Sequence, residues 1–156
     1  MKSIKRILVV SRMNSYNLEA IRSGISLARS YDAKLTVLHL TPNPVELMPN
    51  TTPGPFREDD FVNYLNIQQE VKKQLEAVLK KELQEGFPIQ EIVSDGEPVA
   101  EIVKVVASER INLIVMLAHE EGRLEHALFG GENDAIIRKM PCSILLVKKE
   151  PEPAIW

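Results

Sequence analysis

Two adjacent glycines, Gly130 and Gly131, stand immediately before a predicted short helix over 132–139. Glycines at the N-terminus of a helix let backbone N–H groups approach an anion, and the helix dipole adds positive charge at the same place. The pattern is therefore compatible with a phosphate site. It is at least as typical of a plain turn, so the glycine pair alone leaves both interpretations open.

Two histidines and several carboxylates lie close to that glycine pair. His119 and His126 are accompanied by Glu120, Glu121 and Glu125. A histidine pair that binds metal from one helix face is spaced four residues apart, whereas these histidines are seven apart. We therefore predict a solvated polar loop and no metal site.

Three further reactive side chains have structural interpretations. A nucleophilic Ser11 would need a base and an orienting acid, and no nucleophile-elbow pattern surrounds it. His39 lies within an apolar strand, which favours a packed histidine. Cys142 precedes a strand rich in Ile, Leu and Val, which favours a buried, inert thiol. We predict no catalytic residue.

Composition sets limits on the class of protein. The 156 residues have the size of one domain, and 19 basic against 22 acidic residues give a net charge of −3. This balance argues against nucleic acid as the main partner. The single cysteine excludes an internal disulfide.

The apolar run Ile7–Val10 is shorter than a secretory core of about 7–15 residues, and no run approaches the ~20 residues of a membrane span. We expect a soluble, cytoplasmic protein without membrane contact.

Hydrophobic patterning predicts strands that alternate with helices. Short apolar runs are typical of strands buried on both faces of a parallel sheet, and apolar residues three and four apart are typical of helices packed on it. This order predicts an α/β fold with helices on both faces of one open parallel sheet. The predicted strands are Ile7–Val10, Lys34–Leu40, Pro88–Val93, Ile111–Leu117 and Ser143–Val147. The first predicted helix contains Leu18–Ala28, and the second begins at Asp59 or Asp60 and runs to Glu85. The third begins near Pro98, and the fourth spans 132–139.

Three other segments carry separate predictions. Five prolines between Pro42 and Pro55 predict a long surface loop over 41–57. The apolar stripe Phe61–Leu83 of the long helix is predicted to be core. We expect one domain over residues 1–148 and a poorly ordered tail over 149–156, which ends in Trp156.

In an open parallel sheet, ligands bind beyond the carboxyl ends of the strands, where the strand order reverses. With the first strand central, the candidate residues follow the first and fourth strands. They are Ser11, Arg12 and Met13, then Leu117, Ala118, His119 and Glu120, with Gly130 and Gly131 closing on the same place.

Three segments of the chain resemble the universal stress protein family. They are ILVVSRMNS near the start, DGEPVAEIVKVVASERINLIVM in the second half and LFGGENDAIIRKMPCSILLV near the end. The resemblance extends to about Lys148. It implies a Rossmann-like five-stranded sheet of order 3-2-1-4-5, and commonly a homodimer formed through the last strand.

The nucleotide motif of ATP-binding family members is altered here. That motif is Gly, two residues, Gly, nine residues, then Gly followed by Ser or Thr, and its positions fall on Leu117, Glu120, Gly130 and Gly131. Only the third glycine is kept, and Arg12 replaces an aspartate that usually ends the first strand. Leu117 adds bulk, and Glu120 adds a carboxylate that would repel a phosphate by about 4 kcal/mol at 4 Å and a dielectric of 20.

These departures predict a regulatory or protective protein of the universal stress type that acts by binding. It would be non-catalytic, would carry no cofactor and would not bind ATP in the usual way. The alternative is a stress protein that binds ATP or AMP, with slow ATP hydrolysis, in a remodelled pocket. That pocket would be lined by Arg12, Leu40, Met116, His119, Gly130 and Gly131.

The last predicted strand also predicts a partner. If Ser143–Val147 is a sheet edge, as the resemblance implies, its unpaired backbone groups and apolar side chains favour pairing with a second copy. We therefore expect a symmetric homodimer, together with an unidentified protein partner.

Overall fold

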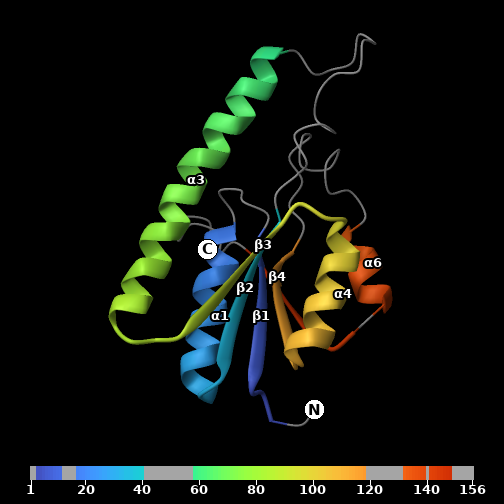
Figure 1. Ribbon diagram of the computed structural model, residues 1–156. Helices are drawn as coiled ribbons and strands as arrows, with labels where there is room; N and C mark the ends of the chain where they lie inside the picture. Colours follow the sequence, from blue (N-terminus) through green and yellow to red (C-terminus); the bar gives the residue numbers. More distant parts are fainter. Residues whose placement is uncertain (1–2, 12–16, 41–57, 119–131, 140, 149–156) are drawn as a thin grey trace, which may run out of the picture.

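The computed structural model describes residues 3–11, 17–40, 58–118, 132–139 and 141–148. The predicted loop 41–57 and tail 149–156 lie outside these residues. The described chain alternates strands and helices throughout (Figure 1). The elements are β1 (Arg6–Ser11), α1 (Asn17–Tyr31), β2 (Lys34–Leu40), α3 (Glu58–Gln84), β3 (Ile89–Ser94), α4 (Pro98–Glu109), β4 (Leu113–Leu117), α6 (Glu132–Lys139) and β5 (Ser143–Val147).

The strands form one parallel sheet in the order β3-β2-β1-β4-β5. This confirms both the predicted α/β class and the strand order that the family resemblance implied. β1 lies at the centre, so the chain moves outward through β2 and β3 and then crosses to β4 and β5. The order therefore reverses beside β1, and β3 and β5 are the two edges.

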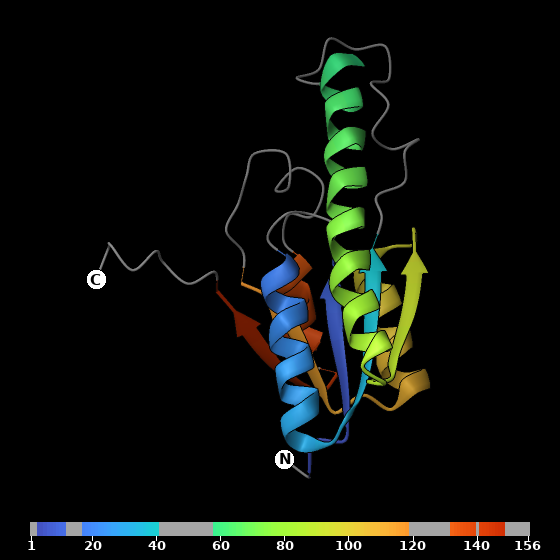
Figure 2. The same ribbon diagram turned by 90° about the vertical axis from the view of Figure 1, so that its left-hand side faces the viewer.

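Helices cover both faces of the sheet. Figure 1 shows α1 and α3 on one side and α4 and α6 on the other, and Figure 2 shows the same layers from the side of α1 and α3. Residues of β1 alternate between the two cores, because successive strand side chains point to opposite faces. Ile7 and Val9 pack in the α1/α3 core, whereas Leu8 and Val10 pack in the α4/α6 core.

The close packing of α1 on β1 depends on Gly24. A Cβ atom at this position would overlap Cγ2 of Val9. Gly24 is itself buried within the helix. The missing side chain is thus what allows this helix to lie against the central strand.

The end of α4 differs from the prediction. Ile111 was predicted to open the fourth strand, but its N–H donates to the carbonyl of Val106 (3.0 Å), after Arg110 takes a left-handed conformation with φ 53°. Such a residue typically closes a helix. β4 therefore begins at Leu113. α4 begins at Pro98 as predicted, and the Glu97 carboxylate accepts hydrogen bonds from the N–H groups of Val99 (3.1 Å) and Ala100 (2.7 Å).

The long helix α3 packs on the sheet only along part of its length. Leu75 and Leu79 are buried in the α1/α3 core, but Val62 and Leu83 are 49% and 46% exposed. Figures 1 and 2 show its N-terminal part rising beyond the carboxyl ends of the strands. The prediction that the stripe Phe61–Leu83 is core was therefore wrong at Leu83, which is exposed.

Candidate functional site

Four side chains form a row across the carboxyl edge of the sheet, on the face of α1 and α3. Ser11 of β1 is in register with His39 of β2, which is in register with Val93 of β3. Leu117 stands two residues beyond Val115, the partner of Val9, and completes the row on β4. We call Leu117, Ser11, His39 and Val93 the carboxyl-edge row. It crosses the point where the strand order reverses, which is where open α/β sheets bind ligands.

His39 is buried, 6% exposed, as predicted for a packed histidine. Its Nε2 lies 3.2 Å from Oε1 of Glu91, one of the exposed residues of β3. If Nε2 carries the proton and donates to this carboxylate, Nδ1 is a hydrogen-bond acceptor. Nδ1 is buried and receives no hydrogen bond from any residue that the structure describes.

Ser11 next to it is also buried, with no exposed surface. Among the described residues its Oγ likewise has no hydrogen-bond partner. Buried polar atoms are normally paired with protein or ordered water. The carboxyl-edge row therefore offers one hydroxyl and one imidazole nitrogen to a polar group or a water molecule.

The series Ser11, His39 and Glu91 has the residue types of a nucleophile, base and acid. Its geometry differs from a working triad, in which the base is hydrogen-bonded to the nucleophile. No hydrogen bond joins Ser11 to His39, and the Ser11 side chain has no surface for a substrate to reach. The arrangement is suited to holding a polar group.

Glu91 was not singled out from the sequence because this residue belongs to no recognisable motif. Its contact with His39 depends on the pairing of β2 with β3, and the hydrophobic pattern of the sequence does not predict which strands pair. The adjacent polar residues Gln90 and Glu91, inside the predicted strand Pro88–Val93, were the available signal of an exposed edge.

The predicted nucleotide pocket is only partly within the described residues. Leu40 and Met116 are each 1% exposed and pack in the α4/α6 core, on the opposite face from Ser11 and His39. The other residues predicted to line that pocket lie outside the described ranges: Arg12, His119, Gly130 and Gly131. The remodelled pocket stays a prediction.

Leu117, at the first position of the altered motif, ends β4. It is in register with Val147 of β5, and the N–H of the following residue, Ala118, donates to the Val147 carbonyl (2.7 Å). The Leu117 side chain is partly buried. The second motif position, Glu120, lies outside the described residues.

Cys142 is partly buried, whereas a buried thiol was predicted from the sequence. Burial raises the pKa of its thiol, against an opposing contribution from the backbone at Ile114. A raised pKa leaves little thiolate at neutral pH, so the thiol is a poor nucleophile. The inert role of Cys142 stays a prediction.

The described ranges contain no group of three or more His, Cys, Asp or Glu side chains arranged to hold a metal ion. Their helices include none with the length and apolar character needed to cross a membrane.

The chain belongs to the universal stress protein family, whose family model matches residues 3–148. This confirms the resemblance found in the sequence. Universal stress protein MJ0577 of Methanocaldococcus jannaschii is 33% identical over 95 residues, which span 59% of this chain and 58% of that protein. Universal stress protein MJ0531 of the same organism is 26% identical over 145 residues, 93% of this chain and 82% of that protein.

Solved structures share the fold. The structure of protein MJ0577 superposes with a TM-score of 0.61 at 22% identity, covering 96% of this chain and 99% of that chain. A universal stress protein family protein from Arabidopsis thaliana with AMP bound has a TM-score of 0.57 at 14% identity, covering 97% and 98%. At these identities the likeness establishes the fold alone.

Proposed function

We propose that this chain is a regulatory or protective stress protein that acts by binding, without catalysis, and that it does not bind ATP in the family's usual way. The observation that carries this proposal is Leu117 at the end of β4. It stands at the first glycine position of the family's ATP motif and belongs to the same row as Ser11 and His39.

A glycine at this position would leave the backbone open to close approach by a ligand. Leu117 instead places a branched side chain there, while its strand is paired with β5 through Val147. Glu120 adds negative charge three residues later, where the motif has its second glycine. Bulk and charge together disfavour a triphosphate.

The absence of turnover is part of the same proposal. Its support is the geometry of Ser11, whose buried hydroxyl is not hydrogen-bonded to His39 in the part of the chain that the structure describes. A serine nucleophile needs such a base.

The second candidate function is nucleotide binding in a remodelled pocket, with slow ATP hydrolysis. The observation that favours it is the AMP bound to the Arabidopsis relative. In this function Arg12, His119, Gly130 and Gly131 would contact the nucleotide, with Leu40 and Met116 behind them.

A homodimer in the cytoplasm accompanies the proposed function. β5 is an edge of the sheet, and Leu145 and Leu146 are 38% and 43% exposed on it. An apolar edge strand favours pairing with a second copy. An unidentified protein partner would then be bound by the dimer.

The test is to purify the protein, denature it and search for released nucleotide by absorbance and chromatography. The proposal predicts no adenine nucleotide in the supernatant and no saturable binding of ATP with or without magnesium. One adenine nucleotide per chain would instead establish the second candidate function.

A further inference from the structure

A pocket of about 350 Å³ opens at the amino ends of the strands, opposite to the carboxyl-edge row. It lies between the first residues of β1, β2 and β3 and the last turn of α4. All of its lining residues are among those described. We propose that this amino-end pocket binds a small organic monoanion, a carboxylate attached to an apolar body.

The positive charge comes from two neighbouring strands. Arg6 of β1 and Lys34 of β2 are register partners, and both line the pocket. Like charges directly across a strand pair are destabilising. An anion bound between them would remove that repulsion, so the pair is suited to a negatively charged ligand.

Arg6 is held in place without being neutralised. Its Nη1 donates to the backbone carbonyl of Glu109 (3.1 Å), which fixes the guanidinium against α4. A guanidinium has five N–H donors, so others stay available. Within the described residues no carboxylate forms an ion pair with Arg6 or Lys34, whereas Arg29 of α1 has two such partners.

The rest of the lining is largely apolar. Leu83, Pro88, Ile89 and Ile111 contribute to it, and Leu83 is one of the large apolar side chains that the fold leaves exposed. The volume is within the range of pockets for small molecules, which are mostly apolar with a few polar groups that orient the ligand. The ligand therefore needs an apolar part as well as its charge.

Glu109 limits the charge that the ligand can carry. It also lines the pocket, so the lining holds two cationic residues and one acidic residue. The remaining single positive charge matches a monoanion, and a polyphosphate would be repelled by Glu109. A planar carboxylate also fits the fork of N–H donors on Arg6.

Binding can be measured by calorimetry with sodium octanoate, and located by the amide shifts of Arg6, Gln90 and Ile111 in NMR spectra. We expect octanoate to bind with a dissociation constant of about 0.1 mM, a reasonable value for a ligand of its size. Acetate, which lacks the apolar body, should bind at least about tenfold more weakly. The amide of Ala118, at the other end of the sheet, should not shift.

Four single substitutions test how charged residues in and near the pocket affect the binding of octanoate. Arg6→Gln should weaken octanoate binding about tenfold, and Lys34→Gln about threefold, since only the guanidinium can donate two parallel N–H bonds to a carboxylate. Glu109→Gln should strengthen it about threefold because it removes the opposing charge. Lys5→Gln, which removes an exposed cation outside the pocket lining, is the matched control and should bind as the wild type does.

The proposal is overturned if octanoate shows no saturable binding up to about 10 mM, a limit far weaker than specific pockets of this size show. It is also overturned if Lys5→Gln weakens binding as much as Lys34→Gln does. If Arg6→Gln fails to fold, the opposite signs expected for Lys34→Gln and Glu109→Gln decide the question. Because the pocket is at the other end of the sheet, these results are independent of those with ATP.

Discussion

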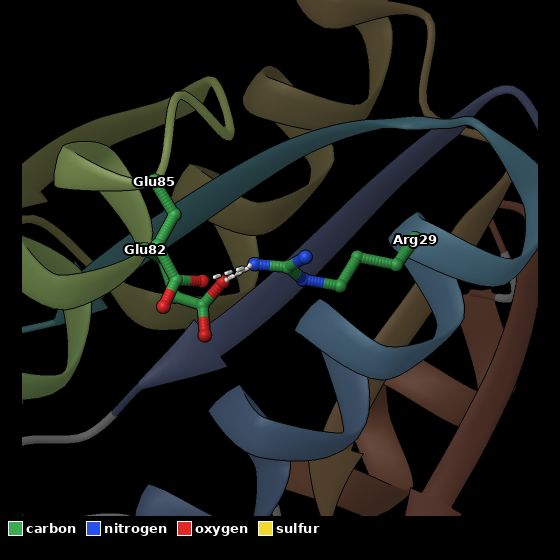
Figure 3. A network of polar contacts seen from close by, with 3 residues as sticks. All are labelled: Arg29, Glu82 and Glu85. Atoms are coloured by element: carbon green, nitrogen blue, oxygen red, sulfur yellow. Dashed lines mark hydrogen bonds and ion pairs between the residues drawn. The ribbon is translucent and has the colours of Figure 1, made fainter.

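Arg29 of α1 forms an ion pair with Glu82 of α3 (Figure 3). The same guanidinium lies 3.0 Å from Glu85 and sits over the ring of Phe87, 5.1 Å from its centroid. The hydrogen bond with Glu82 is the main reason that the pKa of Arg29 is raised. These contacts fasten the C-terminal end of α3 to the body of the domain, while its N-terminal part rises past the sheet (Figure 2).

Arg29→Met should lower the melting temperature by a few degrees, because it keeps an apolar side chain over Phe87 but removes the pairing with Glu82 and Glu85. Thermal unfolding at low salt and at about 1 M salt checks this, since screening should shrink the difference. Arg22→Met, which affects only an exposed pair with Glu19 at 3.6 Å, is the control. An equal effect of both substitutions would contradict a special role for Arg29.

Gly24→Ala should destabilise the fold by about 1–3 kcal/mol, because the added methyl group overlaps Val9 in a packed core. Urea unfolding measures the change. Ser26→Ala on the exposed side of α1 should have little effect. The double variant Gly24→Ala/Val9→Ala should cost less than the sum of the single changes, since it removes the overlapping group. Simple additivity would show that the two residues do not interact.

Cys142 should make the stability decrease at alkaline pH. Burial raises the pKa of the folded thiol above its ordinary value near 9.0. As the pH rises, the unfolded chain loses this proton first and binds fewer protons than the folded chain, so the free energy of unfolding falls. Cys142→Ala should therefore lose less stability than the wild type between about pH 8 and about pH 10. An identical pH dependence would contradict this.

Leu146→Lys tests the proposed dimer. A lysine in the middle of the exposed part of β5 would place like charges against each other in a symmetric interface. Light scattering after size-exclusion chromatography should give a dimer mass for the wild type and a monomer mass for this variant at about micromolar concentration. Val93→Lys, on the opposite edge strand, should remain dimeric. A monomeric wild type would refute the dimer.

The elements of the fold were predictable because their signals are local. Apolar runs such as Ile7–Val10 mark strands buried on both faces, and the alternation with helices is enough for the α/β class. The strand order came from the family resemblance, since patterning does not say which strands are neighbours. The start of β4 was misplaced because Ile111 is apolar whether it closes α4 or opens a strand.

The site was less predictable because it depends on register between strands. Ser11, His39 and Glu91 are separated in the chain by 28 and 52 residues, and only the pairing of β1, β2 and β3 brings them together. From the local sequence, Ser11 was predicted to be non-catalytic and His39 to be packed, and Glu91 was not singled out. The pair Arg6 and Lys34 was missed for the same reason, since each is an ordinary surface cation until the strands align.

The central claim is that Leu117 and Glu120 keep ATP from binding in the family's usual way. Calorimetric titration of ATP with magnesium, performed on the wild type and on Leu117→Gly/Glu120→Gly, tests it most directly. The account predicts no saturable binding to the wild type and a gain of at least about tenfold in affinity for the double variant, because bulk and negative charge are both removed. Tight binding by the wild type, or no gain in the double variant, would contradict it.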